Sequence, residues 1–233
     1  MKTGGFSGGI RGWWEVLFNL SLTVTDKKAS MFDMKNKILD NCKSLVGEDE
    51  RDVLFGIINR YIGYFTTDSQ RQSQNDPGSE YPFVPMDTRQ VYDQLKFVHD
   101  FLFETALFVG RPLSFLDIGC GIGNVLLVAE LMEFVVSGLE KDEYPFAVAA
   151  KLIGLERVVK QDIWDYDLYD SFDIIYYFRP FHEGNLECRF ERFIEDQMKS
   201  GAVLIANRKM DRGIDTDLRF CRLHPELPIW QKA

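Results

Sequence analysis

The residues with the clearest chemical potential form a glycine-rich run at Phe115–Asn124, which reads FLDIGCGIGN. The run contains Gly119, Gly121 and Gly123, and it joins an apolar stretch to a helical pattern. Glycine permits positive φ angles and lets backbone N–H groups approach a ligand closely. The run therefore predicts a ligand-binding turn between a strand and a helix.

Two further acidic residues follow the next two predicted strands. Glu140 comes 21 residues after Gly119 and ends the second strand, where a carboxylate accepts hydrogen bonds from ribose hydroxyls. Asp162 follows the third strand, where it is placed to meet an adenine amino group. Ligands of parallel sheets bind at the carboxyl ends of the strands. The turn and the two carboxylates together therefore predict one nucleoside-binding site.

The spacing of the glycines separates two classes of ligand. A dinucleotide fingerprint needs G-x-G-x-x-G, whose third glycine would fall at Asn124. The run instead reads D-x-G-x-G-x-G, with Asp117 two residues before the first glycine. A carboxylate there repels a pyrophosphate and attracts a ligand with ammonium and sulfonium groups. An NAD-dependent oxidoreductase is therefore the disfavoured alternative.

The elements that must position these residues follow from the rhythm of the chain after Arg111, where short apolar runs alternate with helical patterns. Strands are predicted at 113–118, 134–139, 157–160, 172–178, 202–206, 218–223 and 229–232, and helices at 124–133, 143–153 and 186–198. The alternation indicates βαβ units. We predict an α/β fold with a doubly wound, mostly parallel seven-stranded sheet and an antiparallel last strand.

The N-terminal part of the chain has a different pattern. Apolar residues recur at helical spacing over residues 30–65 and again over 87–109. Between them, residues 66–80 include no apolar side chain, which predicts a flexible loop. We therefore predict a helical N-terminal cap over residues 1–110 and a ligand-binding core over residues 111–233.

Composition excludes several functional classes. The chain has 233 residues, of which 45% are hydrophobic and 27% charged, as in soluble globular proteins. Its net charge of −9 disfavours nucleic acid as a partner. The four cysteines form no CxxC pair and only three histidines are present, so no metal is expected. The sequence contains no membrane-spanning run and no secretory leader pattern, which predicts a cytoplasmic protein without a membrane partner.

From Pro112 to the C-terminus, the glycine run, the strand-end carboxylates and the closing hairpin resemble the class I (seven-strand, Rossmann-like) S-adenosylmethionine-dependent methyltransferases. The resemblance implies S-adenosyl-L-methionine as cofactor, with its methionine part at the glycine run. It also implies that the ribose binds after the second strand and the adenine after the third. The implied cofactor-binding residues are Asp117, Gly119, Cys120, Gly121, Gly123, Asn124, Glu140, Lys141, Asp162 and Ile163.

A second resemblance concerns residues before the glycine run. Tyr81–Leu95 (YPFVPMDTRQVYDQL) and residues 161–178 (QDIWDYDLYDSFDIIYYF) resemble segments of some non-SET protein-lysine methyltransferases, including the family that modifies a membrane ATP-synthase subunit. In these enzymes the first segment closes over the methionine end of the cofactor. The resemblance thus implies that Pro85 and Thr88 lie near the site. The sequence departs from that family in the residues FRPF at 178–181.

The fourth predicted strand ends at Tyr177, Phe178 and Arg179, where an acceptor would enter the site. Tyr177 and Phe178 are candidates to surround a cationic amine, and Arg179 is a candidate to position an acceptor carboxylate. In the alternative interpretation, Tyr176 and Phe178 share a core face and Arg179 forms a structural pair. The Asn/Asp-Pro-Pro-Tyr tetrad of methyltransferases acting on adenine or glutamine is absent, which counts against DNA-adenine activity.

These observations favour an enzyme that transfers a methyl group to a nucleophilic nitrogen or oxygen by in-line displacement. Protein lysine is the first acceptor to consider, and a small-molecule amine or hydroxyl is the alternative. A protein that binds S-adenosylmethionine without turnover is a further alternative, because no acceptor base is identified. The sequence leaves the oligomeric state open.

Overall fold

The computed structural model describes residues 48–104 and 111–233. The chain divides into two units, 1–50 and 51–233, and the description below concerns the second. The expected cap before residue 48, including most of its first predicted helical stretch, lies outside the described residues. None of the described helices is both long enough and apolar enough to cross a membrane.

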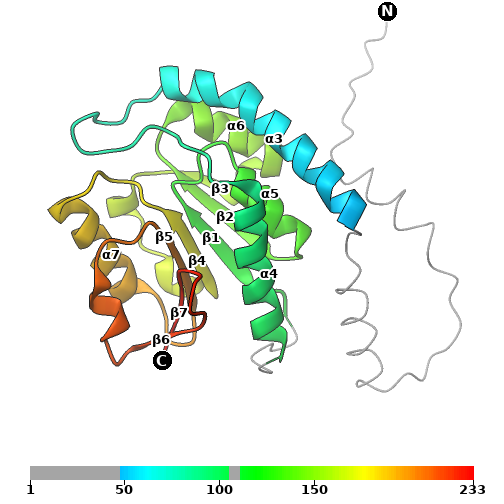
Figure 1. The fold of residues 1–233 in the computed structure, drawn as a ribbon. Coiled ribbons are helices and arrows are strands. Elements are labelled where there is room, and N and C mark those ends of the chain that lie inside the picture. The colour runs from blue at the N-terminus through cyan, green and yellow to red at the C-terminus, as the bar shows by residue number, and fades with distance from the viewer. Residues whose placement is uncertain (1–47, 105–110) are drawn as a thin grey trace, which may run out of the picture. The chain divides into compact units, whose positions relative to one another are not determined.

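A seven-stranded sheet forms the centre of this unit, in the order β3-β2-β1-β4-β5-β7-β6 (Figure 1). The strands are β1 (Ser114–Ile118), β2 (Val135–Glu140), β3 (Val158–Lys160), β4 (Ile174–Phe178), β5 (Val203–Asn207), β6 (Phe220–Arg222) and β7 (Ile229–Lys232). β1 to β5 pair in parallel, whereas β7 is antiparallel to both β5 and β6. The predicted α/β fold is confirmed, and it is the fold that the resemblance to class I methyltransferases implies.

Helices cover both faces of the sheet. They are α3 (Glu48–Arg71), α4 (Thr88–Glu104), α5 (Asn124–Leu131), α6 (Glu143–Ile153) and α7 (Asn185–Gln197), with the short 3-10 helices η1 (Leu155–Arg157), η2 (Ile163–Asp165), η3 (Tyr169–Ser171) and η4 (Arg212–Asp215). Residues of α3 to α6 share one hydrophobic core with the sheet, and residues of α7 share the core on the opposite face. The central strand β4 is apolar at every position because both of its faces are buried.

The first helix of this unit is longer than the sequence predicts. α3 continues through Arg71, so the prediction of a loop is wrong for residues 66–71. Polar side chains there bond within the helix: Thr66 Oγ1 donates to the Ile62 carbonyl at 2.7 Å, and Arg71 pairs with Asp68 at 2.7 Å. Because the preceding turns are anchored in the core, the helix extends over a stretch that has no apolar residue of its own. The expected flexibility of the remaining loop stays a prediction.

The described part of the expected cap packs directly on the sheet. Ile58 of α3 and Leu95 of α4 are fully buried in the same cluster as Phe115 of β1 and Ile174 of β4. Residues 51–104 are therefore a layer of the same compact unit as the sheet. A domain boundary at residue 110 stays a prediction.

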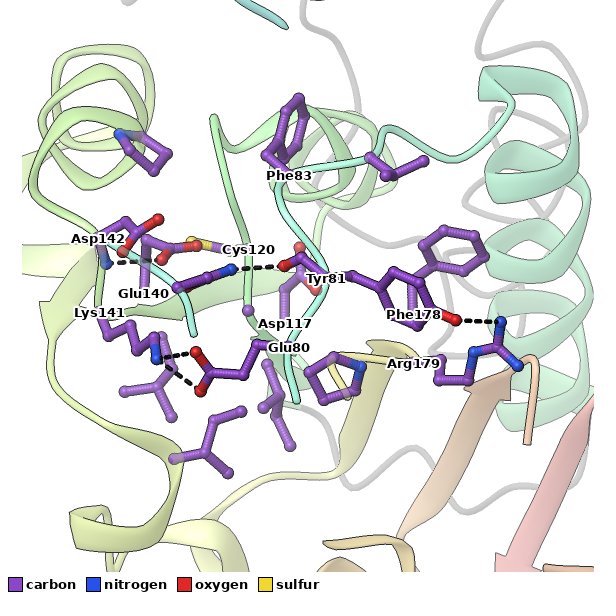
Figure 2. Close-up of a pocket in the computed structure, with 18 of the residues that line it drawn as sticks. Glu80, Tyr81, Phe83, Asp117, Cys120, Glu140, Lys141, Asp142, Phe178 and Arg179 are labelled. Carbon is purple, nitrogen blue, oxygen red and sulfur yellow. Dashed lines mark hydrogen bonds and ion pairs between the residues drawn. The ribbon is translucent and has the colours of Figure 1, made fainter. Parts of the chain in front are cut away.

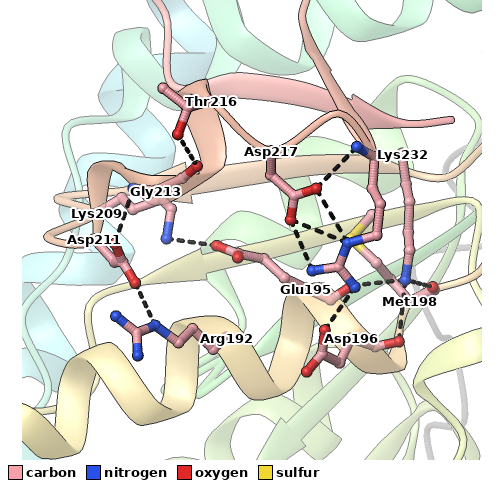
Figure 3. Close-up of polar contacts among 11 residues, drawn as sticks. Arg192, Glu195, Asp196, Met198, Lys209, Asp211, Gly213, Thr216, Asp217 and Lys232 are labelled. Carbon is pink, nitrogen blue, oxygen red and sulfur yellow. Dashed lines mark hydrogen bonds and ion pairs between the residues drawn. The ribbon is translucent and has the colours of Figure 1, made fainter.

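A polar network joins the last strand to the end of α7 (Figure 3). The Lys232 ammonium donates to the backbone carbonyls of Glu195, Asp196 and Met198 at 2.7, 3.0 and 2.7 Å. The last carbonyls of a helix lack intrahelical donors, and a cation there is favourable. The closing hairpin is thus held by strand pairing and by this helix-terminal contact.

Candidate active site

A cavity of about 340 Å³ lies at the carboxyl ends of the parallel strands (Figure 2). Its walls come from the turn after β1, from the residues that follow β2, β3 and β4, and from residues 80–86 before α4. Eight of the ten expected cofactor-binding residues of the core line it: Asp117, Gly119, Cys120, Asn124, Glu140, Lys141, Asp162 and Ile163. The structure therefore brings the predicted residues from three strand ends to one site.

Gly121 and Gly123 do not line the cavity, in contrast to the expectation for them. Their φ angles of 54° and 82° lie in the left-handed region that favours glycine. A Cβ atom on Gly123 would lie 3.2 Å from the Ala149 Cβ atom, and one on Gly121 would lie 2.2 Å from the Phe83 ring. The two glycines shape the turn, because a side chain would be strained at both positions and would also overlap the Phe83 ring at Gly121.

The Glu140 carboxylate is oriented by backbone donors on both sides. Its Oε2 accepts from the Gly121 N–H at 2.9 Å, and its Oε1 accepts from the Asp142 N–H at 2.8 Å. Burial raises the pKa of Glu140 to about 7, although these hydrogen bonds favour the ionised form. A carboxylate oxygen can accept more than one hydrogen bond. Glu140 is therefore fixed in a position from which it can also accept from ligand hydroxyls.

The Asp117 side chain is buried in the cavity wall at only 2% exposure. It has no hydrogen-bond or ion-pair partner among residues 48–104 and 111–233. Burial and the nearby Glu140 carboxylate raise the pKa of Asp117 well above its usual value. An unpaired buried carboxylate is costly, and a cation in the cavity would remove that cost. This end of the cavity therefore has the chemistry to bind a positively charged group.

Lys141 and Asp162 line the cavity but also bond to the protein. The Lys141 ammonium contacts both Glu80 oxygens, at 2.6 and 2.5 Å (Figure 2). Asp162 Oδ1 accepts from the Trp164 N–H at 2.9 Å, which fixes η2 with Ile163 at its start. Glu80 thus neutralises Lys141, and the cavity keeps its acidic character at this end.

Residues 72–86, named here the lid segment, cross the cavity. Near its start, Ser73 Oγ donates to Asp142 Oδ2 at 2.8 Å, beside the N-terminus of α6. Further along, the Tyr81 N–H donates to the Pro180 carbonyl at 3.0 Å, in the loop after β4. The lid segment is therefore tied to both sides of the site.

Several cavity residues were not among the predicted ones: Asn75, Glu80, Tyr81, Phe83, Met86, Asp142, Tyr176 and Arg208. For those of the lid segment, the only signal was the resemblance over Tyr81–Leu95, and Pro85 does line the cavity as it implies. Thr88 does not line the cavity, in contrast to the position that the resemblance implies. Its side chain is buried at the start of α4, where Oγ1 donates to Asn59 Oδ1 at 2.7 Å.

The acceptor side of the cavity contains Phe178 and Arg179 but not Tyr177. Alternate strand residues point to opposite faces of a sheet, so Tyr176 faces the cavity together with Phe178. Tyr177 is fully buried on the other face, with its ring centroid 5.1 Å from that of Phe190. The expectation that Tyr177 surrounds the acceptor is therefore wrong, and Tyr176 takes its place in the wall.

Arg179 forms the structural pair of the alternative interpretation, and its role toward an acceptor stays a prediction. Its guanidinium pairs with Glu183 at 2.9 Å, donates to the Tyr81 hydroxyl at 3.2 Å, and lies 5.1 Å from the centroid of that ring (Figure 2). It also lines the cavity, with a side chain that is 18% exposed. Among the described residues, no group of three or more His, Cys, Asp or Glu side chains could hold a metal ion.

We expect Gly121→Ala to lower the free energy of unfolding by about 2–4 kcal/mol, because it combines left-handed strain with overlap on the Phe83 ring. Gly119→Ala is the matched control. Gly119 has a φ of 71° but open space around its added Cβ, so strain alone should cost about 1–2 kcal/mol. Urea unfolding of both variants, alone and with Phe83→Ala, measures the difference. Equal costs of the two glycine substitutions in the protein that keeps Phe83 would contradict the packing of this ring on the turn.

No protein-family model and no curated protein matches the chain. Among solved structures, it is similar to DesVI from Streptomyces venezuelae, at 18% identity and a TM-score of 0.39, over 50% of each chain. It is similar to CalS10, an amino pentose methyltransferase from Micromonospora echinaspora, at 20% identity and a TM-score of 0.40, over 54% of this chain and 58% of that one. A putative caffeoyl-CoA O-methyltransferase from Staphylococcus aureus matches at 10% identity and a TM-score of 0.48, over 85% of this chain and 99% of that one. The match spans half the length of DesVI.

Proposed function

We propose that this protein binds S-adenosyl-L-methionine in the cavity and transfers its methyl group to a nucleophilic nitrogen or oxygen. The observation that carries the proposal is the buried Asp117 carboxylate, which has no partner among the described residues and lies beside Glu140 at the glycine turn. S-adenosylmethionine combines ribose hydroxyls with ammonium and sulfonium groups. It therefore matches a hydroxyl-accepting carboxylate and an acidic cavity end at the same time.

In this proposal, each part of the cofactor meets residues that line the cavity. Asp117 and Gly119 bind the methionine part, and Glu140 accepts hydrogen bonds from the ribose hydroxyls. Asp162 and Ile163, which follow β3, contact the adenine. NAD would instead bring a negatively charged pyrophosphate next to the Asp117 and Glu140 carboxylates, and these like charges would repel each other.

S-adenosylmethionine supplies an already activated methyl group, so the protein contributes positioning and the exclusion of water. Correct orientation of two reactants is worth about 7–11 kcal/mol of the barrier. The lid segment contributes Phe83 and Pro85 to the cavity wall, which removes water from this side. Phe178 at the end of β4 gives an apolar surface against which an acceptor can be held.

A small-molecule acceptor is favoured over protein lysine by the course of the lid segment. A peptide needs an open groove beside the methyl group, whereas a small molecule needs an enclosed pocket. The backbone of Glu80 in the lid segment forms an isolated antiparallel β-bridge with Phe181, and the His182 N–H donates to the Ser79 carbonyl at 2.8 Å. These contacts cross the acceptor side, which supports an enclosed pocket.

Calorimetric titration with S-adenosylhomocysteine and with NAD tests the cofactor assignment. We expect binding of S-adenosylhomocysteine and no measurable binding of NAD; the opposite result would reject the proposal. Incubation with methyl-labelled S-adenosylmethionine and a cell lysate then tests the acceptor. We expect the label in the small-molecule fraction. Label retained on protein bands would favour lysine, and tight binding without any transfer would favour a non-catalytic module.

A further inference from the structure

Two arginines follow neighbouring strands on the acceptor side of the cavity. Arg179 comes directly after β4 and Arg208 directly after β5, and both line the cavity. The backbone N–H of Arg179 donates to the backbone carbonyl of Asn207 at 3.3 Å. The two chain segments that carry the arginine side chains therefore lie next to each other. The positive charge at this side contrasts with the Asp117 and Glu140 carboxylates at the other.

Arg208 is held in an unusual backbone conformation. Its φ of 61° lies in the left-handed region, which glycine adopts easily and a side chain such as arginine adopts only at a cost. Its guanidinium forms no ion pair or hydrogen bond with any residue of the described ranges. The side chain is exposed although it lines the cavity, so it lies at the solvent-facing rim. Strained residues that persist often belong to binding sites, because the surroundings hold them there.

Arg179 has partners, but these leave it able to bind a ligand. Its ion-pair partner Glu183 has a side chain that is 69% exposed, and pairs with such exposed groups are weak. The Tyr81 ring centroid lies 5.1 Å from the guanidinium carbon, and this cation–π contact does not neutralise the positive charge of Arg179. An anion that enters the cavity can therefore replace Glu183 as the partner of Arg179.

We propose that the methyl acceptor is a small acid whose carboxylate, or other oxyanion, is bound by Arg179 and Arg208. Planar guanidinium groups bind such oxyanions through pairs of parallel hydrogen bonds. Lys141, which lines the cavity beside Glu140, does not compete for the anion, because Glu80 neutralises it. This inference rests on the proposed methyl transfer and adds the acceptor class: its anion anchors it at the rim and directs its nitrogen or oxygen inward.

Probe binding to the protein saturated with S-adenosylhomocysteine tests the proposal. The probes are benzoate and its neutral isostere benzamide, and phenyl phosphate is added to distinguish a carboxylate from a phosphate site. We expect benzoate or phenyl phosphate to bind at least tenfold more tightly than benzamide. Equal binding of charged and neutral probes, or no binding of any of them, would overturn the proposal while leaving the cofactor assignment intact.

Arg208→Gln and the matched variant Arg212→Gln locate the effect. Arg212 begins η4, does not line the cavity, and its replacement removes the same charge. We expect Arg208→Gln to reduce the preference for the charged probe to less than threefold, and Arg212→Gln to keep it. Loss of S-adenosylhomocysteine binding in Arg208→Gln, or an unchanged probe preference, would overturn the role of Arg208. Failure of the wild-type protein to bind S-adenosylhomocysteine would instead reject the proposed function itself.

Discussion

Glu140→Gln is expected to weaken S-adenosylhomocysteine binding about 10- to 100-fold. Both Glu140 oxygens accept from backbone N–H groups, those of Gly121 and Asp142. A glutamine amide must turn its NH2 group toward one of these donors, so one hydrogen bond is lost and the carboxylate no longer binds the ribose hydroxyls. Hydrogen bonds to a charged group are worth about 1.5–3 kcal/mol, which gives the expected factor. Calorimetry at pH 8 measures it.

A comparison with Asp117→Asn makes this prediction specific. 5′-Methylthioadenosine contains the ribose and adenine but lacks the amino-acid part. Glu140→Gln should therefore weaken the binding of both ligands by similar factors. Asp117→Asn should weaken the binding of S-adenosylhomocysteine and leave that of 5′-methylthioadenosine nearly unchanged. Equal effects of the two variants on both ligands would contradict the proposed division of the cavity.

The pH dependence of 5′-methylthioadenosine binding provides a second measurement. Burial raises the pKa of Glu140 to about 7, so the free protein takes up a proton there as the pH falls below 7. If the ribose hydroxyls need the ionised carboxylate, affinity falls by up to tenfold per pH unit below that value. The Glu140→Gln variant has no carboxylate to protonate at this position, so its affinity should not change with pH over this range. A flat profile in the wild-type protein would contradict the role of the carboxylate.

Lys209→Met is expected to lower the free energy of unfolding by about 3–5 kcal/mol. The Lys209 side chain is 1% exposed, and its ammonium lies 3.0 Å from Glu191 and 2.6 Å from Glu195, which are also buried (Figure 3 shows the Glu195 pair). Removing one partner of a buried ion pair leaves an uncompensated charge, and this is the source of the cost. Glu187 lies on the same helix, and its burial and the neighbouring Glu191 raise its pKa to about 8, so at neutral pH it is mostly protonated and adds little negative charge near Lys209.

Lys160→Met is the matched control for this prediction. Lys160 pairs with Glu143, and both side chains are exposed, at 43% and 63%. Exposed pairs contribute about 0–1 kcal/mol. Urea unfolding of the two variants at pH 8 and pH 5 measures the contrast. The cost of Lys209→Met should shrink at pH 5, because protonation of the buried carboxyls removes the unpaired charge; equal costs for the two lysines would contradict it.

The sequence by itself determined the sheet and the acidic half of the cavity. Apolar runs alternating with helical patterns predicted the parallel sheet, and the closing antiparallel pair was also predicted correctly. Asp117, Glu140 and Asp162 were expected at one site, and all three line the cavity. Both inferences succeed because they depend on local periodicity and on one general rule, that the carboxyl ends of parallel strands meet at one edge.

The tertiary structure alone decided which face of β4 meets the cavity. A strand that is apolar on both faces has no polar alternation, so its sequence did not distinguish Tyr176 from Tyr177. The sequence also predicted a loop where α3 continues through Arg71, because anchoring of the helix in the core outweighs the polar composition of that stretch. Local patterns gave no information where packing from both sides set the outcome.

The lid segment and the acceptor side of the cavity depended on tertiary contacts most of all. Glu80 neutralises Lys141, which lies 61 residues away in the chain, and Tyr81 meets Arg179 across 98 residues. Arg208 reaches the cavity through a left-handed backbone that no propensity predicts for arginine. Periodicity and turn chemistry act over a few residues, whereas these contacts form only when the sheet has brought distant segments together.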